Sequence, residues 1–320
     1  MSTDPRASLA WLGYLMVAAS ATFAAANGVF ARLVIDAGVA PQELSATRIY
    51  GAAIVLIVFL VPHVRKLRRG HLLPLAAFGI IGLVLGQGAY FQAISHADIA
   101  LVLVIIFTAP LFVAVYERVR LGETLPVHAW VAMAVAVGGV ALAILGGSGA
   151  SAISLAGFLF AVAAMVTYAT SVILAAGLTT ALPPLARTAV CMLFAVVAWA
   201  VIVPPWTLPF DALGATAEFA GRFGFSMPVW VAVAVVVLVG SVGVYVTWVG
   251  GTSLVGAGAS SMVGIAEPVL AAIFAWALLA QSLSALQAAG IAVTVAGIIV
   301  VEQARIRAKR VLVPDVPVDR

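Results

Sequence analysis

The sequence predicts an all-α integral membrane protein, with ten transmembrane helices arranged as two inverted five-helix repeats. Composition is the first indication, because 64% of the 320 residues are hydrophobic, only 9% are charged, and the mean hydropathy is +1.21. A soluble domain averages about 25% charged residues. The second indication is a series of apolar runs long enough to cross a bilayer, and the third is a match between the two halves at one fixed offset.

The apolar runs, each of about 20 residues, define the expected spans. They cover residues 9–33, 41–62, 72–94, 97–117, 126–146, 153–175, 183–204, 228–250, 254–279 and 284–303. Prolines support several boundaries, because a proline in the first turn of a helix loses no hydrogen bond; they are Pro41, Pro74, Pro126, Pro183 and Pro228. The long polar connection at 205–227 is expected to hold a short helix at the membrane interface.

Basic residues indicate the orientation of the chain. With the N-terminus inside, twelve lysines and arginines fall in the expected inner segments, and only Arg32 and Arg222 fall in the outer ones. The positive-inside rule then places both termini in the cytoplasm, with the chain in the plasma or inner membrane. Residues 305–320 form an expected basic cytoplasmic tail, whose RIRAKR run would meet anionic lipid rather than nucleic acid.

The two halves match when Pro110 is aligned with Pro268, an offset of 158 residues. Glycines and aromatic residues coincide at the same offset; the pairs are Gly82 with Gly240, Tyr90 with Trp248, and Gly139 with Gly297. The repeats are expected at residues 9–146 and 153–304. Because each would hold an odd number of spans, the second would enter the membrane upside down relative to the first, as in many secondary transporters.

Three stretches also resemble a known family. They are APQELSATRIYGAAIVLIVFL, which enters the second span, TAPLFVAVYERVRLGETLPVHAW in the first half, and EPVLAAIFAWALLAQ in the second. Through them the chain resembles the EamA-type branch of the drug/metabolite transporter (DMT) superfamily over about residues 9–304. The resemblance implies a secondary transporter of small organic metabolites, such as amino-acid-, purine- or drug-like solutes. It does not specify the substrate, the direction or the oligomeric state.

One departure from the family pattern stands out. The Leu-Gly-Glu that is typical of both repeats is present as Leu121-Gly122-Glu123, but the second repeat has Leu279-Ala280-Gln281. The function of the second glutamate in relatives is therefore in question for this chain.

Glu267 is the main candidate for a functional side chain. It is a single carboxylate inside an apolar run, where insertion of a charge costs about 2.5–3.5 kcal/mol. Two interpretations are open: a protonatable or cation-binding group in the substrate pathway, or a structural carboxylate paired with Arg48 or a helix-end N–H. Pro268 follows it directly and, like Pro110, is expected to kink its helix.

Arg48 lies about 10 Å inside the second span at helical rise. It could hold an anionic group of a substrate through two parallel hydrogen bonds. It could equally extend its side chain to the outer interface and remain hydrated there.

Polar and aromatic residues fall on single faces of several spans at helical spacing. The candidate pathway residues among them are Asn27, Gln87, Tyr90, Tyr168, Ser171 and Trp248. One interpretation is a cavity lining with a few placed polar groups, and the other is ordinary packing between membrane helices.

The remaining chemistry of the sequence excludes several protein classes. The chain has a single cysteine, Cys191, and four histidines without ligand-like spacing, so we expect no metal and no cofactor. It has no phosphate-binding GxxxxGK[ST] loop and no deep nucleophile–base pair, so we expect no ATP-driven pump and no enzyme. The expected function is export of a small-molecule substrate, coupled to protons through Glu267. The alternatives are an uncoupled facilitator and a non-transporting membrane scaffold.

Overall fold

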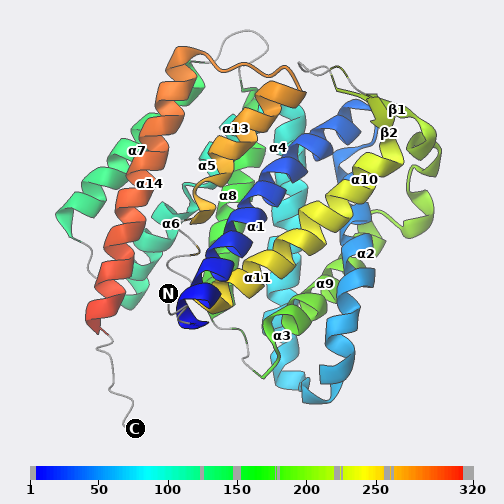
Figure 1. The fold of residues 1–320 in the computed structure, drawn as a ribbon, viewed down its shortest axis with the longest axis horizontal. Helices are drawn as coiled ribbons and strands as arrows, with labels where there is room; N and C mark the ends of the chain where they lie inside the picture. Colours follow the sequence, from blue (N-terminus) through cyan, green and yellow to red (C-terminus); the bar gives the residue numbers. More distant parts are fainter. Residues whose placement is uncertain are drawn as a thin grey trace.

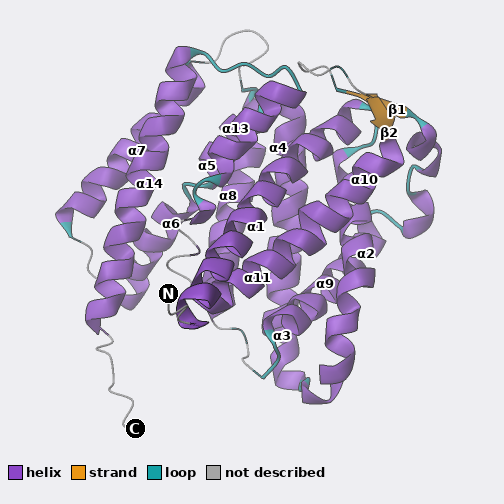
Figure 2. Cartoon of the chain, viewed as in Figure 1, coloured by secondary structure: helices purple, strands orange, loops and turns teal. Residues whose placement is uncertain are grey.

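The computed structural model describes residues 5–122, 126–146, 153–176, 178, 181–219, 224, 226–255, 260 and 263–312. Over these residues the chain is a bundle of helices with one small antiparallel hairpin at its edge (Figures 1 and 2). We call the end of the bundle that carries the hairpin the hairpin end. The opposite end, where α1 (Pro5–Asp36) begins and α14 (Ala285–Leu312) ends, is the N-terminal end (Figure 1).

The first half contains the elements from α1 to α7. After α1 they are α2 (Pro41–Leu60), the 3-10 helix η1 (Val61–Lys66), α3 (Arg69–Phe78), the π-helix η2 (Gly79–Gly86), α4 (Gln87–His96), α5 (Ile99–Ile106), α6 (Ala109–Tyr116), the π-helix η3 (Glu117–Leu121) and α7 (Val127–Leu145). Helices α3, η2 and α4 are continuous and form a single span, Arg69–His96.

The second half contains the remaining elements. They are α8 (Leu155–Ala176), α9 (Pro184–Ile202), the 3-10 helices η5 (Pro205–Thr207) and η6 (Phe210–Gly214), β1 (Thr216–Glu218), β2 (Ser226–Pro228), α10 (Val229–Val237), the π-helix η7 (Leu238–Gly243), α11 (Val244–Val255), α13 (Glu267–Leu278) and α14. Helices α10, η7 and α11 again form a single span, Val229–Val255.

In the part of the chain that the structure describes, nine helices are long and apolar enough to cross a membrane. The expected ninth span, 254–279, is divided: α11 reaches Val255, and α13 begins at Glu267 after a turn at Ile265 and Ala266. Pro268 gives a physical reason, because it has no N–H and its ring crowds the preceding turn. Helix α13 is therefore a shorter apolar helix, and the count of ten full spans stays a prediction.

The expectation of an all-α fold needs correction. The fold is not purely helical, because Thr216, Ala217 and Glu218 pair with Pro228, Met227 and Ser226 in a two-stranded sheet. Strands of three residues are too short to leave an alternating pattern in the sequence. The basic run 305–310 lies within α14, which continues to Leu312 because no helix-breaking residue precedes Pro314. The basic cytoplasmic tail at 305–320 stays a prediction.

Irregular segments occur at matching positions in the two halves. The π-helices η2 and η7 coincide at the offset of 158 residues that aligns Pro110 with Pro268. The turn at Phe107 and Thr108, which separates α5 from α6, coincides in the same way with the turn at Ile265 and Ala266. Local breaks of this kind are not apparent from hydropathy, so their coincidence is independent structural support for the repeat.

Close glycine contacts between helices are also repeated. At each of these glycines a Cβ would lie 3.2 Å or less from an atom of the partner helix. The matching sets are Gly13 against Leu254 and Val255, with Gly157 against His96 and Ala97; and Gly240 against Asn27, with Gly82 against Ser171. Thus α1 packs on the η7–α11 span in the same manner as α8 packs on the η2–α4 span. Small residues allow membrane helices to approach this closely.

Helices α7 and α14 are equivalent in the two repeats, and they contact each other through equivalent residues. A Cβ at Gly139 would lie 2.5 Å from Thr294 Oγ1, and one at Gly297 would lie 2.8 Å from the Cβ of Ala136, which is the residue equivalent to Thr294. The Thr294 hydroxyl donates a hydrogen bond to Ala136 O at 3.2 Å. Gly146 approaches Gln287 farther along, so the two helices run antiparallel.

The largest cluster of buried residues lies toward the hairpin end and joins parts of α1, α4, α5, α10 and α13. It continues to the hairpin through Phe219, whose ring packs edge-on against Phe30 with centroids 5.7 Å apart. A second cluster joins α2 and α9 and reaches the N-terminal end at Leu60 and Leu182. The segment that precedes α13 is less tightly packed, since no described residue lies within 4 Å of a Cβ at Gly264 and Ala266 is exposed.

Candidate functional site

Arg48 connects the two halves of the molecule. It is only 5% exposed. Its Nε donates to Ser241 Oγ at 2.5 Å, its Nη2 donates to Gly240 O at 3.1 Å, and its Nη1 donates to Gln87 Oε1. The guanidinium also lies over the ring of Phe91, 5.7 Å from the centroid. Ser241 and Gly240 belong to η7 in the second half, whereas Gln87 and Phe91 belong to α4 in the first.

These hydrogen bonds determine where the Arg48 side chain lies and how its charge is compensated. All three guanidinium nitrogens are bound inside the protein, so the side chain does not extend to the membrane interface. A buried charge held by three hydrogen bonds to fixed groups is already well compensated. Arg48 therefore acts as a cross-link between the halves in this conformation.

The π-helix η7 explains why Arg48 finds acceptors in an apolar run. A π-helical turn departs from the regular α-helical ladder, which leaves backbone and side-chain groups available at that point. Gly240 offers its carbonyl, and Ser241 both accepts from Arg48 and donates to Val236 O at 3.1 Å. Neither residue is among the site residues predicted from the sequence. The match of Gly240 with Gly82 was a signal for packing, and a serine within LVGSVG was the remaining clue.

Asn27 and Ser171 take equivalent places in the two halves, 144 residues apart. Asn27 is 6% exposed and packs on Gly240, while Ser171 is 7% exposed and packs on Gly82. The Ser171 hydroxyl donates to Thr167 O within its own helix at 2.7 Å. The Asn27 Oδ1 is buried and accepts no hydrogen bond from any described residue. The hydroxyl of Ser171 thus has a hydrogen-bond partner in its own helix. Asn27, in contrast, has an acceptor without a described partner beside Gly240, whose carbonyl binds Arg48.

Glu267 is the first residue of α13 and is half-buried. Among the described residues it has no hydrogen-bond or ion-pair partner, so the pairing with Arg48 that one of the two interpretations offered is not a direct contact. Arg48, Tyr90 and Tyr168 are nevertheless near enough to interact with Glu267 electrostatically. Its position in the first helical turn also favours a negative charge through the helix dipole. Glu267 therefore differs from Arg48 in that no described residue forms a hydrogen bond with it.

The aromatic candidate residues differ in exposure, and of these Tyr90 and Tyr168 are near enough to Glu267 for an electrostatic interaction with it. Tyr90 is buried, with its hydroxyl against Gly28. Tyr168 is 47% exposed and Trp248 is 49% exposed. Tyr168 interacts electrostatically with both Glu267 and Tyr245, which belong to α13 and α11. The structure thus brings Arg48, Gln87, Tyr90, Tyr168 and Glu267 into one region, with Asn27 joined to it through Gly240.

The two predicted kink positions both lie next to helix breaks. The turn at Phe107 and Thr108 precedes Pro110, and the turn at Ile265 and Ala266 precedes Pro268. Pro268 is buried at the second position of α13. The side chain of Pro110 lies outside the described part of the structure.

Gln281 has a specific contact in the structure. Its Oε1 accepts a hydrogen bond from the N–H of Ile99 at 3.4 Å, at the first residue of α5. Asp98 is the N-cap of that helix but makes no capping bond with its side chain. Burial raises the pKa of Asp98, and the positive charge of nearby Arg32 partly opposes this rise. A neutral amide at position 281 avoids placing a second carboxylate beside Asp98. Glu123, the counterpart of Gln281, lies outside the described residues.

Comparisons with known proteins agree with this architecture. The model of the EamA-like transporter family matches the chain twice, at residues 11–145 and 155–302. Of the solved structures, 27 chains match. One, titled only as the crystal structure of a protein, is 20% identical, with 92% of this chain and 98% of that chain covered and a TM-score of 0.55. It shares the fold alone. A comparison with curated proteins gave no match.

The family match covers nearly all of both halves, and the helices within it are apolar enough to make the chain a multi-pass membrane protein. On these grounds the chain belongs to the EamA-like transporter family.

Proposed function

We propose that the chain is a secondary transporter of small organic solutes, which exports its substrate across the cell membrane by alternating access between two inverted repeats. We further propose that Glu267 couples this export to protons. Membership of the EamA-like transporter family is the observation that carries transport itself. It also fits a protein that is not an enzyme.

The reciprocal contacts support the inverted arrangement. Two close contacts that α1 makes with the second half, at Gly13 and Gly240, have counterparts that α8 makes with the first half, at Gly157 and Gly82. The equivalent helices α7 and α14 lie antiparallel to one another, as an axis in the membrane plane requires. The start of α1 and the end of α14 lie at the N-terminal end of the bundle, which also carries the basic η1 segment (Figure 1). The positive-inside rule makes that end cytoplasmic.

The uneven packing supports a conformation open to the cytoplasm. The largest cluster of buried residues lies at the hairpin end, whereas no described residue lies within 4 Å of a Cβ at Gly264, three residues before Glu267. Helix breaks before Pro110 and Pro268 provide hinge points in the two equivalent helices. Solute from the cytoplasm would reach Glu267 in this conformation, and closure about the hinges would expose the site to the other side. This sequence of states corresponds to export.

Glu267 is the best candidate for coupling because of the contrast with Arg48. All three guanidinium nitrogens of Arg48 donate hydrogen bonds to groups of the protein, so its charge links the two halves. Glu267 has no such partner among the described residues, and a carboxylate inside a membrane protein that lacks a fixed partner can exchange a proton or a cationic group. Tyr168, which is about half-exposed, provides aromatic surface for an organic solute near Glu267.

The test is flux through purified protein in liposomes, across a panel of amino acids, purines, sugars and cationic drugs. Wild type is expected to accumulate at least one solute when a proton gradient is imposed. Glu267→Gln keeps the shape of the side chain but cannot ionise, so it should lose gradient-driven accumulation and retain exchange of the solute down its own gradient. Glu218→Gln, at an exposed position in β1, is the matched control and should behave as wild type.

Two other results would each decide against part of the proposal. Equal proton-independent flux through wild type and Glu267→Gln would identify an uncoupled facilitator and make Glu267 structural. Absence of flux for every solute, in protein that is folded and correctly inserted, would favour a membrane scaffold. The direction is read from the sign of flux in vesicles of known orientation.

A further inference from the structure

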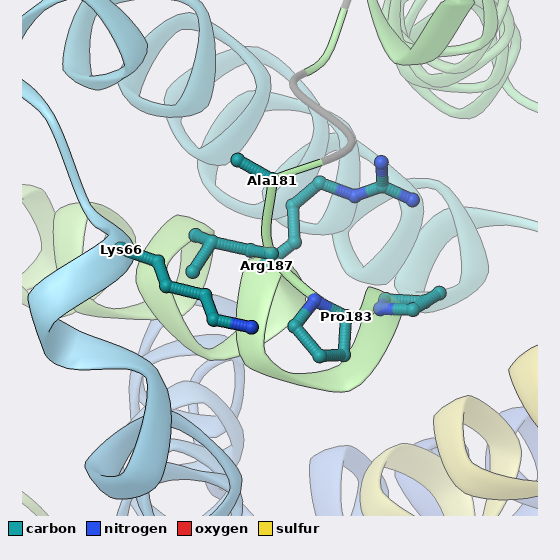
Figure 3. A pocket seen from close by; sticks show the side chains of 6 residues that line it. Lys66, Ala181, Pro183 and Arg187 are labelled. Atoms are coloured by element: carbon teal, nitrogen blue, oxygen red, sulfur yellow. The ribbon is translucent and has the colours of Figure 1, made fainter.

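A basic pocket at the N-terminal end lies apart from the region of Glu267. It has a volume of about 370 Å³ and is lined by Lys66, Ala181, Leu182, Pro183, Pro184 and Arg187 (Figure 3). Lys66 is the last residue of η1, which follows α2 in the first half. The other lining residues lead into or belong to the first turn of α9 in the second half. The pocket therefore lies between the two halves of the protein.

The chemistry of the lining is specific. The two charged side chains of the pocket are both cations, and its other walls are apolar side chains. Figure 3 shows Lys66 reaching from η1 toward Pro183, while Arg187 extends past Ala181 on the other side. An anion placed in the pocket would have a positive group on each flank and apolar surface behind it. This combination suits an amphipathic anion better than a small, fully hydrated one.

The surroundings of the pocket are those of a membrane interface. Three further exposed arginines, Arg65, Arg68 and Arg69, lie on or next to η1. Apolar Val61 and Val64 on the same 3-10 helix are 67% and 53% exposed. Alternation of exposed apolar and basic side chains at the end of a transmembrane helix is typical of a segment at the headgroup level of a bilayer.

We propose that this pocket binds the phosphate of an anionic phospholipid headgroup, with Lys66 and Arg187 flanking the phosphate and the glycerol on the apolar wall. A basic pocket between transmembrane helices on the cytoplasmic side is a recognised setting for such headgroups. The bound lipid would bridge η1 and α9, and so would stabilise the packing of the first half against the second. The site is independent of substrate and of Glu267.

The experiment compares the purified full chain in phosphatidylcholine nanodiscs with and without phosphatidylglycerol. The readouts are the thermal unfolding midpoint and the phosphatidylglycerol that stays bound in native mass spectrometry. Phosphatidylglycerol should raise the midpoint and remain bound to wild type. Lys66→Gln should weaken its retention about fivefold, and Lys66→Arg should restore it, because each basic group contributes a similar attraction to an anionic lipid.

Arg65→Gln is the matched control, since it removes a neighbouring exposed cation that does not line the pocket. If Lys66→Gln and Arg65→Gln weaken retention equally, the effect is general surface attraction and the pocket proposal is wrong. Inorganic phosphate in phosphatidylcholine nanodiscs separates the two sources of the anion. A midpoint shift equal to that of phosphatidylglycerol would overturn the lipid assignment in favour of free phosphate. Arg187→Gln extends the test; should it fail to fold, the Lys66 variants alone decide it.

Discussion

The two halves of the molecule share features of helix packing but differ in their charged residues. The shared features are all features of packing: helix breaks before Pro110 and Pro268, π-helices η2 and η7, and matching glycine contacts. The features that carry charge are not shared. Glu267 has Ala109 as its counterpart, a residue that is fully buried in a small apolar cluster.

This difference separates architecture from chemistry. Gln87, which binds Arg48, has Tyr245 as its counterpart, so the polar network also exists only once. A repeated contact must fit in both halves, which favours glycine and other small residues. A buried charge is costly, and one copy suffices for a site on the axis between the halves. The asymmetric residues are therefore the ones to examine for function.

The largest expected effect on stability comes from Arg48, the link that is made only once. Arg48→Ala removes three hydrogen bonds to a charged group and leaves buried acceptors at Ser241, Gly240 and Gln87 unpaired. We expect a loss of about 3 kcal/mol or more. Thermal unfolding of the purified protein in detergent measures it, with the exposed Arg65→Ala as control. A loss as small as that of the control would mean that packing alone joins the halves.

Repeated glycines should give an intermediate and symmetric effect. Gly139→Ala would bring a methyl group to 2.6 Å from Thr294 N, and Gly297→Ala would bring one to 2.8 Å from Ala132 O. Backbone atoms cannot move aside cheaply, so each variant should lose about 1–3 kcal/mol.

Gly138→Ala supplies the control for the glycine variants, because no described atom lies within 4 Å of a Cβ there. Alanine is favoured over glycine inside a helix by about 1 kcal/mol, so this variant should be as stable as wild type or more so. The same unfolding assay serves for all three. Very different losses at Gly139 and Gly297 would contradict the equivalence of α7 and α14.

The smallest expected effect concerns the turn where the repeats depart from each other in sequence. Gly122 has φ 69° and Ala280, its counterpart, has φ 56°, so both adopt the left-handed conformation that favours glycine. Ala280→Gly should stabilise the protein by up to about 1 kcal/mol, and Gly122→Ala should destabilise it by about 1–2 kcal/mol. Opposite shifts of the unfolding midpoint are expected. Shifts of the same sign would show that the two turns are not equivalent.

The sequence by itself determined the membrane class, the approximate spans and the repeat. Hydrophobic runs of bilayer length and the spacing of Pro110 and Pro268 are local or periodic signals, so they can be recognised without a fold. The same signals located Arg48 and Glu267, since a charge in an apolar run is conspicuous in any sequence.

The tertiary structure alone decided what these residues contact. Arg48 binds Ser241 and Gly240, almost two hundred residues away, because a π-helix in the second half places acceptors opposite α2. No local pattern encodes a π-helix or a contact of that range. The same holds for the hairpin, for the contact of Gln281 with α5, and for the pocket beneath Lys66. Each depends on groups from distant segments, which only the packing of the two halves brings together.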